Sequence, residues 1–112
     1  MQLTQRVVGD VMIVAVIHDI TLNAGGDIML KDKVRSLLEQ GHKKLVLDLG
    51  GVSYVDSAGL GELVQAYATT KNKGGSLKLL GVTKRLKDLL TITKLVTVFD
   101  SYDTEAAALA SF

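Results

Sequence analysis

The pattern of apolar and polar positions predicts that the chain begins with a hairpin. Residues 2–8 roughly alternate between apolar and polar side chains, and the apolar run 11–17 follows after Gly9 and Asp10. A two-residue Gly-x turn between two such segments favours a tight hairpin. The run 11–17 contains no polar position and many β-branched residues, so we expect a strand that is buried on both faces.

Four later segments have the apolar spacing of helices that bury one face. The first covers residues 27–40, with Asp27 as its predicted N-cap and Gly41 as its C-terminal stop. The others cover residues 57–71, residues 83–91 with Thr83 as the cap, and a terminal helix opened by Asp103. The predicted buried faces are Leu30, Val34, Leu37 and Leu38; Leu60, Leu63, Val64, Tyr67 and Ala68; Leu86, Leu89 and Leu90; and Ala106, Leu109 and Ala110.

The remaining apolar runs, residues 44–49, 76–80 and 96–99, are predicted strands, which gives the order β-β-α-β-α-β-α-β-α. Strands that alternate with helices form parallel crossovers, whereas a hairpin must be antiparallel. We therefore expect one α/β domain over residues 1–112, with a mixed, mostly parallel sheet and an antiparallel N-terminal edge hairpin.

Composition narrows the functional classes. The 13 Lys and Arg nearly balance the 12 Asp and Glu, so there is no electrostatic case for direct nucleic-acid binding. The absence of Cys excludes disulfides, thiolate nucleophiles and Cys-based metal sites. The longest apolar run is far shorter than the ~20 residues that span a bilayer. The first residues also lack a signal peptide's apolar stretch, and we expect a cytoplasmic protein without membrane insertion.

The strongest candidate for a functional site is residues 56–61, Asp-Ser-Ala-Gly-Leu-Gly. Ser57 stands where a loop becomes a helix, and from that position alone an N-cap is its simplest interpretation. Gly59 and Gly61 favour a functional role, since each glycine costs a helix about 1 kcal/mol relative to alanine. They leave backbone open to another molecule, so we expect alanine at either position to keep the fold and weaken partner binding.

Other chemistries fit the sequence poorly. A G-x-S-x-G hydrolase elbow requires Gly at position 55, which is Val, and His42 should lie at the opposite end of the sheet from Ser57. Neither Gly59-Leu60-Gly61 nor residues 73–76 has the strand and helix context of a nucleotide-binding loop. The two His and the scattered carboxylates have no metal-ligand spacing.

The sequence is compatible with two roles for each of two further features. Asp48, the polar residue in the apolar run 44–49, could cap a neighbouring element or orient the Ser57 loop. The basic cluster at residues 84–87 could be a solvated helix face or an interaction patch.

Residues 47–61 resemble the signature segment of STAS-domain anti-sigma-factor antagonists. In that family an apolar strand ending in Asp-Leu is followed by a short loop and by Asp-Ser-Ser/Thr/Ala-Gly-Leu/Ile-Gly. Residues 73–80, 84–90 and 95–99 are similar to the family's Gly-Gly turn and strand, third helix and last strand. The resemblance covers essentially the whole chain and implies the STAS fold.

The resemblance implies a phosphorylation switch at Ser57 without catalytic activity or a cofactor of its own. A GHKL-type serine kinase, which is the anti-sigma factor, would phosphorylate Ser57; the unphosphorylated form would bind this kinase and release a sigma factor, and a PP2C-type phosphatase would reset it. The implied partner-binding residues are Asp19, Thr21, Asn23, Asp56, Ser57, Ala58, Gly59, Leu60 and Gly61.

Alternatives remain within and outside the family. His18 stands where many members have Gly, which bears on partner specificity. Some STAS domains are stressosome scaffold pieces or subunits of lipid or anion transport assemblies, and this role is the second hypothesis. A small nucleotide-binding protein is the third hypothesis. Self-association as a homodimer is also left open.

Overall fold

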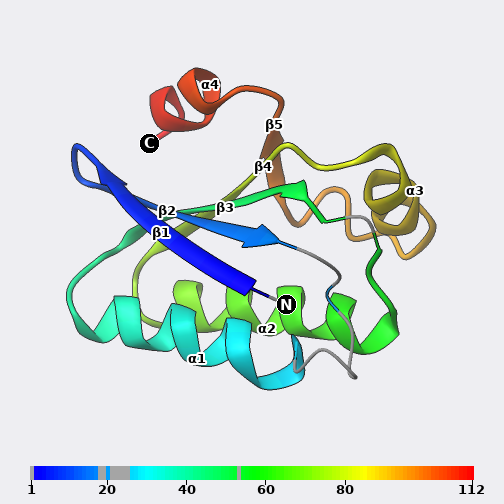
Figure 1. The fold of residues 1–112 in the computed structure, drawn as a ribbon, viewed down its shortest axis with the longest axis horizontal. Helices are drawn as coiled ribbons and strands as arrows, with labels where there is room; N and C mark the ends of the chain where they lie inside the picture. Colours follow the sequence, from blue (N-terminus) through cyan, green and yellow to red (C-terminus); the bar gives the residue numbers. More distant parts are fainter. Residues whose placement is uncertain (1, 18–19, 21–25, 53) are drawn as a thin grey trace.

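The computed structural model describes residues 2–17, 20, 26–52 and 54–112, and these ranges contain five strands and four helices (Figure 1). The element order β-β-α-β-α-β-α-β-α agrees with the prediction. The strands are β1 (Gln2–Val8), β2 (Val11–Ile17), β3 (Lys44–Gly51), β4 (Ser76–Leu80) and β5 (Asp100–Tyr102), and the helices are α1 (Gly26–Glu39), α2 (Ser57–Asn72), α3 (Lys84–Ile92) and α4 (Glu105–Ala110).

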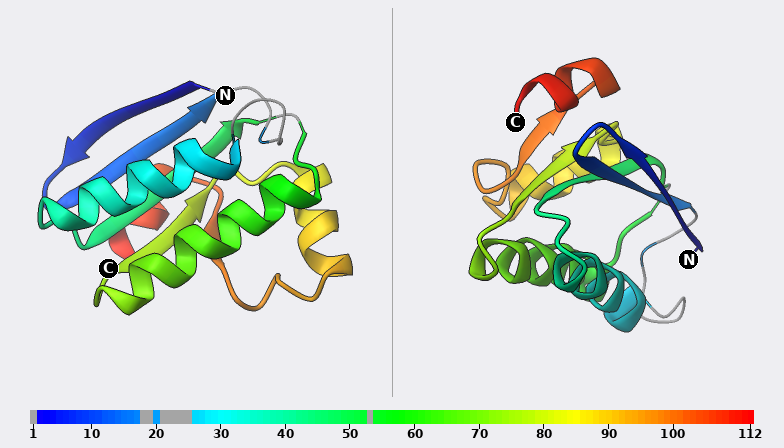
Figure 2. Two further views of the ribbon diagram at one scale, coloured as in Figure 1. Left: turned by 90° about the horizontal axis from the view of Figure 1, so that it is seen from below. Right: turned by 90° about the vertical axis from the view of Figure 1, so that its left-hand side faces the viewer.

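The strands form one sheet in the order β1-β2-β3-β4-β5. The β1–β2 pair is antiparallel and every other neighbouring pair is parallel, which confirms the mixed sheet with an antiparallel edge. Helices α1 and α2 lie side by side under one face, α4 covers part of the other face, and α3 stands at one end of the sheet (Figures 1 and 2).

The central strands divide their side chains between the two layers. Leu45, Leu47 and Leu49 of β3 belong to the large core under α1 and α2, whereas Val46 belongs to a smaller core under α4. This alternation follows from the two-residue repeat of a strand. A strand with apolar side chains on both faces needs a packed layer on each face. β2 is buried along most of its length, as predicted for the run 11–17.

The last strand was predicted in the wrong place. Residues 96–99 form turns, and β5 begins only at Asp100. Phe99 is buried in the large core instead, with its ring 5.3 Å from that of Tyr67 in an edge-on contact. Phe99 is therefore apolar because it packs in a loop and not because it pairs in a strand, whereas Val96 and Val98 are exposed.

Two helix caps also differ from the prediction. α1 begins at Gly26, so Asp27 is its second residue and not the N-cap. α4 begins at Glu105 with Thr104 as its cap, and it buries Ala108, whereas the predicted Ala106 and Ala110 are exposed. Gly41, with φ of +95°, is confirmed as the stop of α1, and Thr83 as the cap of α3.

The buried face of α2 is rotated by about one residue from the predicted stripe. Leu60 and Leu63 are buried as expected, but Ala68 is exposed, while Ala66 and Thr70 are buried. The Thr70 hydroxyl donates to the carbonyl oxygen of Ala66 at 2.8 Å, which satisfies it within the helix.

A buried carboxylate joins the two helices of the lower layer. Glu62 of α2 is only 3% exposed, and its Oε1 accepts a hydrogen bond from the backbone N–H of Lys31 in α1 at 2.8 Å. A buried charged group is tolerated only when it is hydrogen-bonded. Glu62 therefore links α1 to α2 by a buried hydrogen bond.

We expect Glu62→Ala to lower the free energy of unfolding by about 1–3 kcal/mol, because it removes the acceptor of the Lys31 N–H. Glu62→Gln keeps an acceptor oxygen and should cost less. Urea unfolding of both variants measures the difference. If Glu62→Gln were as unstable as Glu62→Ala, or if neither variant lost stability, the bond to Lys31 would not contribute to the stability of the domain.

Candidate functional site

The predicted Ser57 site is built around one residue that follows β2. The N–H of Ile20 donates to the carbonyl oxygen of Tyr54 at 3.0 Å, and the carbonyl oxygen of Ile20 accepts from the N–H of Asp56 at 3.3 Å. Ile20 and Val55 form an isolated parallel bridge, and Ile20 is fully buried. The turn between β3 and α2 is thus fastened to the chain that leaves β2.

This fastening requires glycine at position 59. A Cβ built on Gly59 would lie 1.9 Å from the carbonyl oxygen of Ile20 and 2.7 Å from its carbonyl carbon. Real Cβ atoms do not approach backbone so closely, so only glycine lets α2 reach Ile20. Alanine at Gly59 would therefore strain this contact and destabilise the domain, whereas Gly61 has open space around its Cβ position.

Asp56, and not Ser57, caps α2. Its backbone is extended, its Oδ1 accepts from the N–H of Gly59 at 2.7 Å, and its carbonyl oxygen accepts from the N–H of Leu60 at 2.8 Å. This is the geometry of an N-cap residue. The simplest sequence interpretation of Ser57 was therefore wrong: Ser57 is the first helical residue, and its side chain is exposed.

The Ser57 hydroxyl takes part in no hydrogen bond with another described residue. It stands at the N-terminal end of a helix of 16 residues, where backbone N–H groups favour negative charge. His42 lies before β3, at the opposite end of the sheet, as predicted, and His18 lies outside the described residues. The described side chains contain no cluster of metal ligands.

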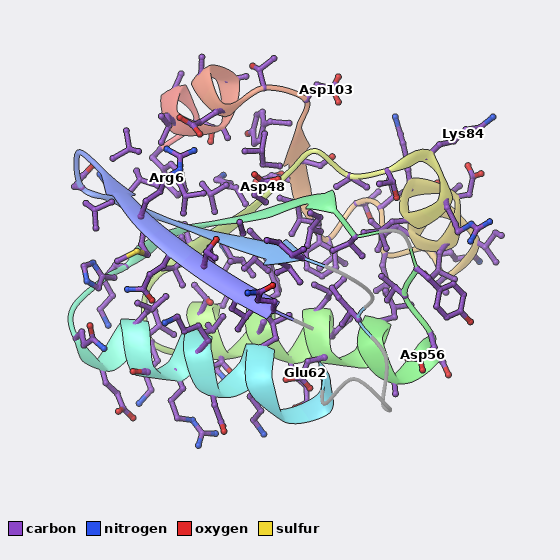
Figure 3. All side chains as sticks on the ribbon, in the orientation of Figure 1. Arg6, Asp48, Asp56, Glu62, Lys84 and Asp103 are labelled. Carbon is purple, nitrogen blue, oxygen red and sulfur yellow. The ribbon has the colours of Figure 1, made fainter. Side chains whose placement is uncertain are left out.

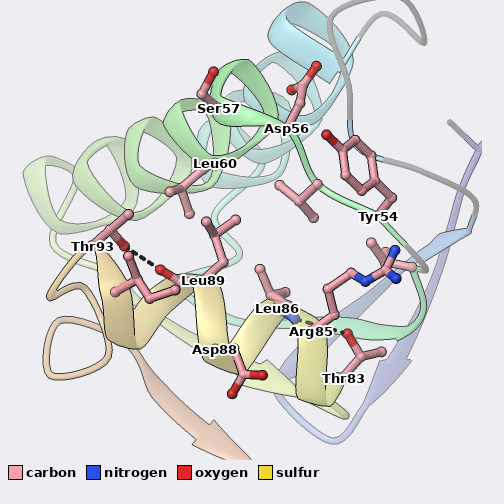
Figure 4. Close-up of a pocket in the computed structure, with 13 residues that line it drawn as sticks. Tyr54, Asp56, Ser57, Leu60, Thr83, Arg85, Leu86, Asp88, Leu89 and Thr93 are labelled. Carbon is pink, nitrogen blue, oxygen red and sulfur yellow. Dashed lines mark hydrogen bonds between the residues drawn. The ribbon is translucent and has the colours of Figure 1, made fainter.

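An apolar pocket of about 410 Å³ opens beside Ser57, between the start of α2 and α3. Figure 4 shows Asp56, Ser57 and Leu60 on one side of it and the α3 residues Arg85, Leu86 and Leu89 on the other. We call it the α2–α3 pocket. Its lining residues are Val52, Tyr54, Val55, Asp56, Ser57, Leu60, Thr83, Arg85, Leu86, Asp88, Leu89, Ile92 and Thr93.

The structure brings together part of the predicted site. Asp56, Ser57 and Leu60 line the pocket, Ala58 is half-buried, and Gly59 is buried against Ile20. The predicted partner-binding residues Asp19, Thr21 and Asn23 lie outside the described residues.

Asp48 has a local role. Its Oδ1 accepts from the N–H of Gly50 at 3.0 Å, a bond between two residues of β3. Figure 3 places Asp48 near the upper side of the sheet and Asp56 at the N-terminal end of α2. The three basic residues of the cluster, Lys84, Arg85 and Lys87, are all exposed, and Arg85 also lines the pocket.

The contribution of α3 to this site was missed by sequence reasoning. Ile92 lines the pocket and is 78% exposed, and Tyr54, which also lines it, is 47% exposed. The signal was present in the α3 pattern, because an apolar residue stands at 92, off the buried stripe formed by Leu86 and Leu90.

None of the described helices is long and apolar enough to cross a membrane.

The family comparison agrees with this geometry. The model of the STAS domain matches residues 2–108. The chain belongs to the STAS-domain family. The anti-sigma-B factor antagonist of Bacillus subtilis (strain 168) is 40% identical over 89 residues, which is 74% of this chain and 81% of that protein. The anti-sigma-B factor antagonist of Listeria monocytogenes is 35% identical over 83 residues, covering 70% and 73% of the two chains.

Solved structures share the fold of this STAS domain. The crystal structure of the Thermotoga maritima protein TM1081 has a TM-score of 0.88 at 24% identity, covering 97% of this chain and 92% of that one. The unphosphorylated form of the anti-sigma factor antagonist SpoIIAA has a TM-score of 0.73 at 14% identity, covering 98% and 96%. The predicted STAS fold is confirmed.

The two glycines of this STAS domain should respond oppositely to alanine. Gly59→Ala should lower the free energy of unfolding by about 2–3 kcal/mol, because the new Cβ forces α2 away from Ile20. Gly61→Ala should be neutral or raise it by up to about 1 kcal/mol, since the site is open and alanine favours helix. Chemical unfolding of the two single variants compares them directly, and equal stabilities would contradict the contact between Gly59 and Ile20.

Proposed function

We propose that this protein is an anti-sigma factor antagonist that is switched at Ser57. The observation that carries the proposal is the position of Ser57. It is the first residue of α2, and its side chain is exposed. Asp56 caps the helix, so the Ser57 hydroxyl is not used as the cap. A kinase can reach a hydroxyl in this position without unfolding the helix. The names of the curated relatives from Bacillus and Listeria support the same role.

The proposed cycle has two states. The unphosphorylated protein binds an anti-sigma factor that is a GHKL-type serine kinase, and a sigma factor is thereby released. The kinase transfers the terminal phosphate of ATP to the Ser57 oxygen, whose proton is lost, and ADP leaves. The phosphorylated protein dissociates, and a PP2C-type phosphatase hydrolyses the ester to restore Ser57. ATP and its metal belong to the kinase, and this chain supplies only the acceptor.

The charge balance at α2 explains why one phosphate would act on binding and not on folding. Phosphate adds about −1.5 to −2 charges, which a helix N-terminus favours by about 0.3–1 kcal/mol. The neighbouring Asp56 carboxylate opposes it by like-charge repulsion. These opposing effects are similar in size within the domain. At a partner surface, by contrast, like-charge contact costs several kcal/mol.

Ser57 should be the main phosphate acceptor. Phosphopeptide mapping after incubation with the kinase and ATP identifies the modified residue. Phosphorylated protein, and the Ser57→Asp variant, should bind the kinase at least about tenfold more weakly than the unmodified protein. Both should melt within a few degrees of it, since ~1 kcal/mol corresponds to ~4–8 °C.

The matched control is Ser36→Asp, which adds the same charge at an exposed serine on α1. It should bind the kinase as the unmodified protein does. Phosphate found mainly at another serine, or equal losses of affinity in both Asp variants, would contradict the role of Ser57.

The α2–α3 pocket is the surface that such a partner would cover while it reaches Ser57. Burial of an isoleucine side chain contributes about 1.5–3 kcal/mol, and Ile92 is 78% exposed in the free protein. Ile92→Ser should therefore weaken kinase binding by about tenfold. Val96→Ser, a change at an exposed apolar residue outside the pocket lining, is the control. Titration calorimetry measures both, and unchanged affinity for Ile92→Ser would place the partner elsewhere.

A further inference from the structure

The outer edge of β1 has the properties of a pairing surface. β1 is the first strand of the sheet order, and within the described ranges no strand pairs with its outer side. Natural proteins block such edges with short strands, proline, charges or bulges, because unpaired backbone groups invite another strand. β1 has seven residues and no proline, and Arg6 is its single charged residue.

The other features near this edge do not block it. Arg6 forms an ion pair with Glu105, which holds its charge toward α4. The opposite edge of the sheet is different, since β5 has only three residues and begins with Asp100, paired with Lys78. Of the two edges, β1 is the one that is long, regular and weakly charged.

The hairpin register shows which backbone groups of β1 point outward. Val8 and Val11 flank the two-residue turn, and the pair that flanks such a turn exchanges hydrogen bonds. Hydrogen-bonded and non-hydrogen-bonded pairs then alternate along an antiparallel ladder. By this alternation Leu3, Gln5 and Val7 direct their N–H and C=O groups away from β2.

These three residues have a self-complementary order. Apolar Leu3 and apolar Val7 lie at equal distances from polar Gln5, and the three side chains share one face of the strand. A two-fold axis at Gln5 would set Leu3 opposite Val7 of a second copy, and Gln5 opposite Gln5. On the other face, Arg6 would meet Thr4, so no like charges would face each other.

We propose that a second copy of this chain pairs with β1, antiparallel, about a two-fold axis at Gln5, to join the two sheets into one. Each of the three outward pairs would exchange two N–H···O bonds. Val7, which is 55% exposed, would be covered by Leu3 of the second copy. The two-fold symmetry makes the contact isologous, so it closes as a dimer and does not extend into a fibre.

The arrangement of the layers leaves this edge accessible. β1 lies at the outer border of the sheet, and α1 lies on one face of the sheet and not across its edge (Figure 2). A contact made by a single pair of short strands buries less than the roughly 1,200–2,000 Å² of a standard interface. The dimer should therefore be weak and dependent on protein concentration.

The register can be tested with a single engineered cysteine, because the chain has none of its own. Hydrogen-bonded antiparallel partners have Cα atoms about 5.5 Å apart, within the disulfide range of about 4.4–6.8 Å. Gln5→Cys should give an interchain disulfide under mild oxidation. Thr4→Cys, on the opposite face of β1, and Gln65→Cys, an exposed position on α2, are the controls and should stay largely monomeric.

A charge pair at the same position supplies an independent test by sedimentation equilibrium. Gln5→Lys and Gln5→Glu should each weaken self-association at least about tenfold, because like charges meet at the axis. An equimolar mixture of the two variants should recover it as a heterodimer. Gln65→Lys should associate as the unmodified protein does. Circular dichroism confirms that each variant is folded.

The outcomes decide the proposal without any anti-sigma factor in the experiment. A protein that stays monomeric at millimolar concentration overturns it. A dimer that Gln5→Lys leaves intact, or equal disulfide yields at positions 5 and 65, also overturns it and assigns the contact to another surface. The proposed switch at Ser57 stands or falls separately by its binding to the kinase.

Discussion

The approach of the Ile20 carbonyl to Gly59 is the contact on which the rest of the site depends. It requires a residue without Cβ in the first turn of α2, since a methyl group would lie 1.9 Å from the Ile20 oxygen. The same carbonyl oxygen accepts the N–H of Asp56, and the Ile20 N–H reaches Tyr54. One buried residue therefore ties the chain after β2 to the turn that presents Ser57.

This constraint assigns the capping of α2 and the presentation of a hydroxyl to two different residues. Asp56 is held in extended backbone, and its carboxylate caps α2 by accepting the Gly59 N–H. Ser57 is left at the first helical position with its side chain in solvent. Modification of Ser57 would then change the surface beside the α2–α3 pocket while the cap and the contact with Ile20 stay in place. A switch of this kind acts on partners and leaves the stability of the domain nearly unchanged.

Most of the fold could be predicted from periodicity, because strands and helices each bury a regular set of apolar positions. Prediction was wrong where tertiary contacts decide. Residues 96–99 resemble a strand, yet Phe99 is apolar because it packs against Tyr67 in a loop. The sequence predicts that another molecule approaches the bare backbone of Gly59, but the group that approaches it is the carbonyl of Ile20 in the same chain. No local pattern reports a contact between residues so far apart in sequence.

The functional site, like the fold, could be predicted only in part from the sequence. Its central segment could be found from the spacing of Asp56, Ser57 and the glycines, since that spacing resembles the STAS signature. The contribution of α3 could not, because only the folded chain places Leu86, Leu89 and Ile92 beside the start of α2. The buried Glu62 was also missed, since its role appears only when α1 supplies the N–H of Lys31.

Amide hydrogen exchange of the Ser57-phosphorylated protein tests the central claim most directly. We predict that the Gly59 and Ile20 amides keep the protection that they have in the unmodified protein, because their acceptors on Asp56 and Tyr54 stay in place. Loss of protection at both amides after phosphorylation would contradict a switch that changes the surface alone. It would show that the phosphate acts by releasing the turn from Ile20.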